Sequence, residues 1–155
     1  MRLQKATAIA LYAVLELASD PERQLTAVEI AEKYEVSAHH LAKVLRDLGR
    51  GGLITSERGV GGGYRFAGDV KRLTLMDVIG LFEDVSADSD ELPPQEVGQE
   101  IAQGLRFVLT ELDTLSVATL RAITLATMLK LVARRPWAAA TQAATPRRRK
   151  AHPGR

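Results

Sequence analysis

The stretch that decides the fold is Val36-Ser-Ala-His-His-Leu-Ala-Lys-Val-Leu-Arg-Asp-Leu48. Its apolar residues recur at steps of three and four, which places them on one face of a helix. These residues are Leu41, Val44, Leu45 and Leu48. Ser37 precedes the pattern as a candidate N-cap, so we expect a helix over residues 37–50 with its histidines and cations facing solvent.

A second, shorter helix is expected just ahead of this stretch. Thr26 followed by Glu29 fits a capping box, which marks the helix start. Its apolar residues are expected to face the core, and they are Val28, Ile30, Ala31 and Tyr34. Residues 35–37 would form the turn between the two helices. Upstream, residues 6–18 predict a further amphipathic helix that ends before Asp20-Pro21, because proline disfavours helix in the residue before it.

Two strand-like runs follow, Leu53-Ile-Thr55 and Tyr64-Arg-Phe66, on either side of a glycine cluster. This arrangement predicts a β-hairpin with a glycine-rich tip. Arg58 and Arg65 are expected to give the hairpin positive charge. A thin tip beside an arginine suits a narrow minor groove, where the DNA potential is most negative.

Helix, turn, helix and hairpin, in that order, predict a winged helix-turn-helix that binds DNA. Ser37, His39, His40 and Ala42 would reach base edges in a major groove, while Lys43 and Arg46 would meet base edges or phosphates. The wing contacts expected beside Arg58 are Gly59, Gly61, Gly62 and Tyr64. An ordinary amphipathic helix with a solvated polar face is the alternative explanation of the helix alone.

The glycine cluster does not match a nucleotide-binding loop. Tyr64 follows Gly63 where a P-loop needs lysine and where a dinucleotide fingerprint needs its third glycine. No nucleophile motif such as GxSxG is present, and adjacent His39 and His40 point about 100° apart on a helix, which disfavours a shared metal site. The sequence therefore does not predict an enzyme.

The C-terminal half predicts helices of another kind. Thr74 and Asp77 mark the start of a helix over residues 73–83, which would close a winged domain of residues 1–84. Residues 85–95 form a polar loop, and residues 96–135 carry a long helix of about 27 residues, some 40 Å in length, and a short terminal helix. The long helix has apolar residues at heptad spacing, at Ile101, Leu105, Val108, Leu112 and Leu115. So long a helix is expected to pack against a second copy, although an intrachain core helix is the alternative.

Charge and composition restrict the classes of partner that this chain is expected to bind. Residues 1–72 carry 11 basic and 9 acidic side chains, residues 73–133 carry 3 and 10, and residues 134–155 carry 7 and none. DNA is therefore a plausible partner for the N-terminal part or for the basic tail of residues 136–155, which we expect to be disordered. Solvated surface is the alternative meaning of these charge blocks. No signal peptide or membrane-spanning run is recognised, so a soluble cytoplasmic protein is expected.

At Arg58-Gly-Val-Gly-Gly-Gly-Tyr64 the chain resembles the Rrf-two family of winged-helix transcription regulators. Further matches are Ile30-Ala31, Val36-Ser37 with Leu41, and Leu73-Thr-Leu-Met-Asp-Val-Ile79. The resemblance covers roughly residues 1–131. It implies a mainly helical protein with a small β-hairpin wing, and a homodimer with long crossed C-terminal helices on a palindromic operator. It also implies a regulator, most simply a repressor, with Arg58 as the wing arginine.

Many members of that family hold an iron–sulfur cluster on cysteines in the loop before the long helix. The corresponding loop here is Ser86–Gln95, and the whole chain contains no cysteine. Because such clusters depend on thiolate ligands, we expect no cofactor of this kind. A small molecule or a partner protein could serve as effector instead. A winged helix that docks on protein and does not bind specific DNA is the alternative function.

Overall fold

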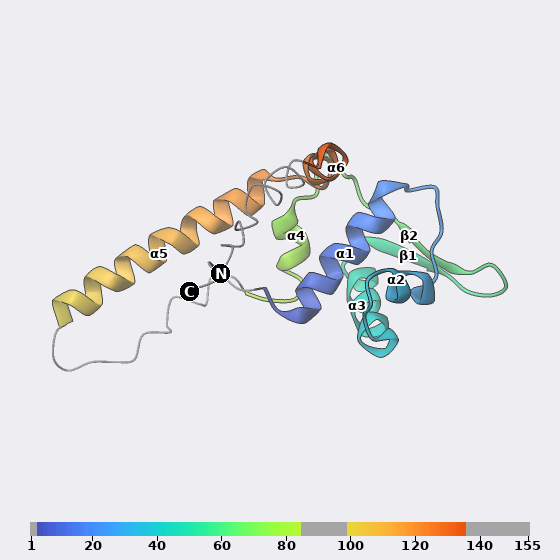
Figure 1. Cartoon of the computed structure of the whole chain (residues 1–155), viewed down its shortest axis with the longest axis horizontal. Helices are drawn as coiled ribbons and strands as arrows, with labels where there is room; N and C mark the ends of the chain where they lie inside the picture. Colours follow the sequence, from blue (N-terminus) through green and yellow to red (C-terminus); the bar gives the residue numbers. More distant parts are fainter. Residues whose placement is uncertain (1–2, 85–98, 136–155) are drawn as a thin grey trace, which may run out of the picture.

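The computed structural model describes residues 3–84 and 99–135; the expected loop 85–95 and basic tail 136–155 lie outside these residues. The described part is mainly helical with one two-stranded antiparallel hairpin, as predicted (Figure 1). In chain order the elements are α1 (Lys5–Ser19), α2 (Ala27–Lys33), α3 (Ala38–Arg50), β1 (Ile54–Glu57), β2 (Gly63–Phe66), α4 (Leu75–Ile79), α5 (Gln99–Ala122) and α6 (Leu125–Arg134).

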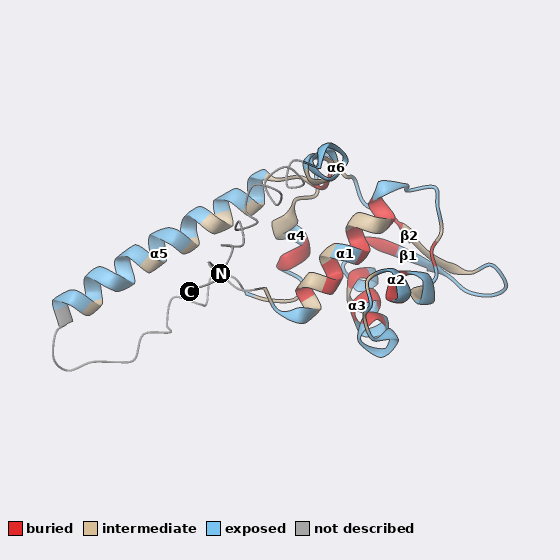
Figure 2. Cartoon of the chain, in the orientation of Figure 1, coloured by how far each residue is buried: buried red, intermediate tan, exposed pale blue. Residues whose placement is uncertain are grey.

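Helix α1 lies at the centre of the winged body and packs against α3, α4, α6 and β2. Its small side chains Ala10 and Ala13 are fully buried, which lets neighbouring backbones approach closely. Leu41, Val44, Leu45 and Leu48 of α3 are also buried, with at most 3% of their surface exposed. The predicted apolar face of α3 is therefore its core face, and the opposite face points to solvent (Figure 2).

The helix starts follow the predicted capping chemistry. The Thr26 hydroxyl accepts from the Glu29 N–H (3.2 Å), and the Glu29 carboxylate accepts from the Thr26 N–H (2.7 Å). Thr74 and Asp77 make the same reciprocal pair at α4, although the regular helix there ends at Ile79, short of the predicted residue 83. One prediction for α2 is wrong: Val28 is 59% exposed, because a helix of seven residues buries only Ile30 and Ala31.

The end of α5 is joined to the start of α4 by backbone hydrogen bonds. The Leu75 N–H donates to Ile123 O (2.9 Å), and the Leu125 N–H donates to Leu73 O (2.8 Å) around a Thr74–Thr124 bridge. Leu125 at the start of α6 is fully buried in the main core. From this seam α5 extends away from the winged body (Figure 1).

Candidate nucleic-acid interface

Helix α3 presents a continuous polar face. The predicted contact residues Ser37, His39, His40, Ala42, Lys43 and Arg46 are all exposed. Because the apolar residues of the same helix are locked into the core, this face has a fixed orientation relative to the body. Helix α3 thus packs against the body through its apolar side, and its polar side, which is expected to contact DNA, is exposed to solvent.

The turn between α2 and α3 is tight. Glu35 adopts a left-handed backbone conformation with φ +52°, and the Val36 N–H donates to Ala31 O (3.0 Å). Ser37 occupies the predicted N-cap position, but its hydroxyl makes no capping hydrogen bond. The expected capping role of that hydroxyl is therefore wrong in this conformation, and the first N–H groups of α3 have no side-chain cap from Ser37.

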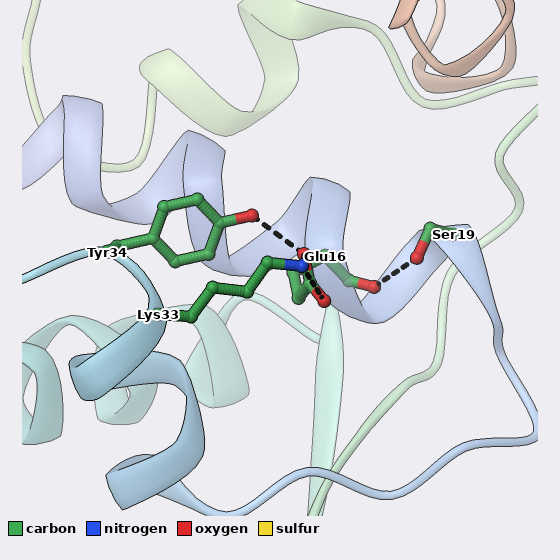
Figure 3. A network of polar contacts seen from close by, with 4 residues as sticks. All are labelled: Glu16, Ser19, Lys33 and Tyr34. Atoms are coloured by element: carbon green, nitrogen blue, oxygen red, sulfur yellow. Dashed lines mark hydrogen bonds and ion pairs between the residues drawn. The ribbon is translucent and has the colours of Figure 1, made fainter. Parts of the chain in front are cut away.

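A polar network fixes α2 against α1 (Figure 3). Lys33 Nζ donates to both carboxylate oxygens of Glu16 at 2.7 Å, and the Tyr34 hydroxyl donates to Glu16 Oε2 at 2.7 Å. The Tyr34 ring also stacks on Tyr12 with ring centres 5.1 Å apart. Helix α2, the first helix of the helix-turn-helix, is thus held to α1 by polar contacts as well as by its two buried residues.

These contacts shift the acidities of the network. Burial alone would raise the pKa of the Glu16 carboxyl, but hydrogen bonds from Lys33 and Tyr34 and the charge of Lys33 together lower that pKa below its ordinary value. Burial, together with the hydrogen bond to Glu16, raises the pKa of the Tyr34 hydroxyl well above its ordinary value. Glu16 therefore stays ionised and Tyr34 stays protonated at neutral pH.

The hairpin has the predicted form of a wing. Ile54 pairs with Phe66, and the register continues to Glu57 opposite Gly63. Gly59 and Gly61 adopt positive φ angles of +107° and +79° at the tip. A Cβ at Gly62 would clash with the Glu57 carbonyl oxygen, so the return of the chain requires glycine there.

Arg58 and Arg65 have different roles in the wing. The Arg65 guanidinium donates to Glu22 O (3.0 Å) and Gln24 Oε1 (3.3 Å), and its Nε lies 4.0 Å from Glu57 Oε1. The donors of Arg65 therefore hold the loop before α2. Because both hydrogen-bond acceptors are neutral, Arg65 keeps its positive charge in the hairpin, with the Glu57 carboxylate beside it. Arg58, at the tip, is exposed.

A groove of about 730 Å³ runs between α3 and the hairpin. It brings together four predicted contact residues, Ala42, Arg46, Arg58 and Tyr64. Thr55 and Ser56 of β1 line the same groove, although the sequence did not single them out. For Thr55 the signal was its place after buried Ile54, because successive strand residues face opposite sides, whereas this alternation does not account for exposed Ser56.

The remaining α3 residues lie elsewhere. His40 and Lys43 line a separate pocket between α3 and the first turn of α1. Ser37 and His39 line neither of these two cavities, although both are exposed. The predicted site residues thus form one outer helix face with two distinct flanks.

The long helix α5 carries an uncovered apolar stripe. Its five heptad residues are exposed, at 81% for Ile101, 47% for Leu105, 52% for Val108, 54% for Leu112 and 62% for Leu115. Phe107 is 67% exposed as well, and the sequence analysis did not select it because it stands outside the heptad spacing. Leu109 and Leu120, in contrast, are partly covered.

The described residues do not fit a metal centre. Within residues 3–84 and 99–135 no group of three or more His, Cys, Asp or Glu side chains is placed to hold a metal ion. Over the same ranges, no helix is both long and apolar enough to cross a membrane.

A family model described as "Rrf2: Iron-dependent Transcriptional regulator" matches residues 3–131. The chain belongs to the Rrf2 family. It is 51% identical over 132 residues to BadM of Rhodopseudomonas palustris, which is described as a candidate HTH-type transcriptional regulator; the match covers 85% of this chain and 83% of that protein. Members of the Rrf2 family are DNA-binding transcriptional regulators and not enzymes, which confirms the function class expected from the wing motif.

Solved structures of the same fold include two named regulators. CymR, titled the global cysteine regulator of B. subtilis, superposes with a TM-score of 0.69 at 22% identity, covering 84% of this chain and 97% of that one. IscR of T. potens superposes with a TM-score of 0.59 at 23% identity, covering 95% of this chain and 93% of that one. These likenesses confirm the winged helix-turn-helix fold with its long helix α5.

The family description names iron, yet this Rrf2 chain offers no thiolate to bind it. The whole sequence lacks cysteine, and the described residues hold no alternative ligand group. Because iron–sulfur clusters are held mainly by cysteine thiolates, the residues present do not fit such a cluster.

Proposed function

We propose that this Rrf2 protein is a cytoplasmic, sequence-specific repressor that binds a palindromic operator as a homodimer. Residues 37–50, with α3, would enter the major groove, and wing residues 56–65 would lie at the minor groove. The observation that carries the proposal is the groove between α3 and the hairpin, where Arg46 and Arg58 stand on opposite walls. Two cations on the walls of one groove match a backbone phosphate or a minor-groove edge.

The proposed contacts divide by chemistry. Ser37, His39, His40 and Ala42 would face base edges, because they occupy the first turn and a half of the exposed helix face. Lys43, which follows them directly, and Arg46, about one turn further on, would meet phosphates. Gly59, Gly61 and Gly62 would let the wing backbone approach the DNA closely, with Arg58 as its cation. Tyr64 would contact DNA from the groove beside α3.

Dimerisation is proposed to occur through α5. The exposed stripe from Ile101 to Leu115 is the kind of surface that a soluble chain covers with a partner, because isolated apolar side chains are common but a continuous row is not. A heptad row fits a second copy of itself. A two-fold protein then places two α3 helices on two half-sites, which requires a palindromic operator.

This proposal assigns a role to each part of the chain. Residues 1–84 would bind DNA, residues 85–95 would join the two parts, residues 96–135 would dimerise, and residues 136–155 would form a basic tail. Seam contacts between α4 and α6 make the dimerising part continuous with the DNA-binding part.

Titration of duplex DNA against salt tests the proposal. A fluorescently labelled random duplex and fragments of the protein's own promoter region would be titrated at several salt concentrations. We expect log affinity to fall steeply with log salt, with a slope corresponding to several neutralised phosphates, and the promoter to bind more tightly. A flat salt dependence, or no complex at low salt, would instead favour a protein-docking module.

A further proposal concerns the cofactor: this chain works without an iron–sulfur cluster. Protein purified without oxygen should be colourless, with iron and acid-labile sulfide far below one per chain. Binding of DNA should also survive treatment with an iron chelator. A brown protein with stoichiometric iron and sulfide would contradict this.

A further inference from the structure

A pocket of about 340 Å³ lies between the first turn of α1, one side of α3 and the residues after α4. Its apolar surface includes Ile9, Val44, Leu81 and Phe82. The Gln4 N–H donates to Glu83 Oε1 (3.3 Å), which ties the start of α1 to the segment after α4; Glu83 itself does not line the pocket. Small-molecule sites in proteins start at about this volume and combine an apolar lining with a few placed polar groups.

Two of the polar side chains that line this pocket are cationic. Lys5 of α1 and Lys43 of α3 line it from two different helices, with Asp47 as the single acidic residue of the lining. Within the part of the chain that the structure describes, neither lysine forms an ion pair; the pairs there are Lys33–Glu16 and Arg65–Glu57. Among the residues that line the pocket, two lysines face one carboxylate beside an apolar surface, which suits a ligand with one negative charge and an apolar body.

The pocket also follows the recognition helix. His40, Lys43, Val44 and Asp47 line it at the spacing of one helix side, so an occupant would lie along about two turns of α3. Two of these residues, His40 and Lys43, belong to the proposed DNA contacts. A bound anion would therefore compete with DNA for Lys43 and would add contacts between α3, α1 and the segment after α4.

We propose that this pocket is an effector site for a small organic carboxylate with an apolar body, and that its occupation weakens DNA binding. The regulatory half of this inference rests on the proposed DNA-binding function, whereas the binding half does not. Lys5 and Lys43 hold the carboxylate, and Ile9, Leu81 and Phe82 contact the apolar body. By thermodynamic linkage, if the ligand lowers the affinity for DNA, then bound DNA lowers the affinity for the ligand by the same factor.

The binding half is tested without DNA. Hexanoate and phenylacetate are titrated into the full chain and followed by ligand-observed NMR or calorimetry, with hexanamide as the neutral comparator. We expect both carboxylates to bind at millimolar or lower concentration and hexanamide to bind at least about fivefold more weakly, as one charge interaction would require. Absence of binding by both carboxylates, whether because the pocket is too small or because a second copy covers it, overturns the proposal.

Variants locate the site. Lys5→Gln removes a pocket cation that is not a proposed DNA contact, so it should weaken carboxylate binding about fivefold and leave DNA affinity unchanged; Lys71→Gln is the matched control and should change neither. Ala6→Leu adds bulk to the lining and should also weaken carboxylate binding, whereas Asp47→Asn removes the opposing charge and should strengthen it. Carboxylate binding that Lys5→Gln, Ala6→Leu and Asp47→Asn all leave unchanged would place the ligand elsewhere and refute this site.

The regulatory half is tested by titrating operator DNA in saturating hexanoate. We expect affinity to fall about fivefold or more in the parent and much less in Lys5→Gln. A carboxylate that binds through Lys5 but leaves DNA affinity unchanged would overturn the regulatory half alone. Failure of every duplex to bind, with carboxylate binding intact, would instead overturn the proposed function and leave the pocket assignment standing.

Discussion

Helices α3 and α5 have the same kind of sequence pattern, but their apolar residues differ in how far they are buried. Each carries apolar residues at steps of three and four, yet those of α3 are at most 3% exposed and those of the α5 stripe are 47–81% exposed. The difference is what lies beside them. Helix α3 packs on α1 and β1 of its own chain, whereas the α5 stripe has no cover within the described residues. An amphipathic pattern therefore predicts that a face will be buried, but it does not say by which chain.

The largest effect should come from a substitution on the buried face of α3, which should change the free energy of unfolding. Leu45→Ala in α3 removes a side chain that is 1% exposed, and it should lower the free energy of unfolding by about 2–5 kcal/mol. Denaturant unfolding at fixed protein concentration measures the change. A loss below about 1 kcal/mol would show that α3 is not held by this core contact.

A charged substitution in the exposed α5 stripe should weaken association between two chains. Leu112→Asp places a charge in the middle of the α5 stripe and should weaken the dimer by at least about a hundredfold, roughly 2.7 kcal/mol. Thr110→Asp, on the opposite side of the same helix, is the control and should leave association unchanged. Sedimentation velocity over a concentration series distinguishes the two. Parent protein that sediments as a monomer at all concentrations would refute the role proposed for the stripe.

Measurements of DNA affinity should distinguish the winged body, which is proposed to contact DNA, from α5. Arg58→Ala removes the exposed wing cation and should weaken operator binding by about 1–3 kcal/mol without changing the oligomeric state. Lys43→Ala should weaken binding more evenly across DNA sequences if it meets phosphate. Fluorescence anisotropy with operator and random duplexes reads both effects, and Arg121→Ala on α5 serves as a distant control. Unchanged affinity in both Arg58→Ala and Lys43→Ala would mean that the docking geometry is wrong.

The smallest expected effect lies in the network that fixes α2. The lowered pKa of Glu16 means that its ionised form stabilises the fold above the pKa that this carboxyl has in the unfolded chain. That stability should fall as pH drops through the lower, folded-state pKa. Glu16→Gln should therefore cost about 0.5–1 kcal/mol near neutral pH, and the difference from the parent should shrink in acid. A cost that is the same at acidic and neutral pH would show that the charge of Glu16 contributes nothing.

Local chemistry accounts for what the sequence predicted well. The Thr26–Glu29 and Thr74–Asp77 boxes act within one turn, and the α3 stripe needs only the 3.6-residue period, so both could be read directly. Val28 was misassigned because a two-turn helix has too few residues to define its buried side. The partners of Arg65, Glu22 and Gln24, could not be predicted because they are some forty residues away.

The same limit applies to the candidate site. The wing arginine and the α3 face follow from the motif itself, and so does the absence of thiolate ligands. Thr55 and Ser56 enter only once the hairpin stands beside α3, and the pocket beneath Lys43 exists only because Lys5 and Leu81 meet there. Contacts between elements far apart in sequence have no periodic signal, so single-sequence reasoning does not find them.

The seam at Thr74 and Thr124 has a consequence for how such regulators diverge. Its hydrogen bonds from Leu75 to Ile123 and from Leu125 to Leu73 use backbone groups alone, so any residue except proline at positions 75 and 125 keeps both donors. If α5 pairs as proposed, this junction sets how far apart the two recognition helices are carried. Substitutions on the exposed face of α3 would then change which bases are read and leave the distance between half-sites unaltered.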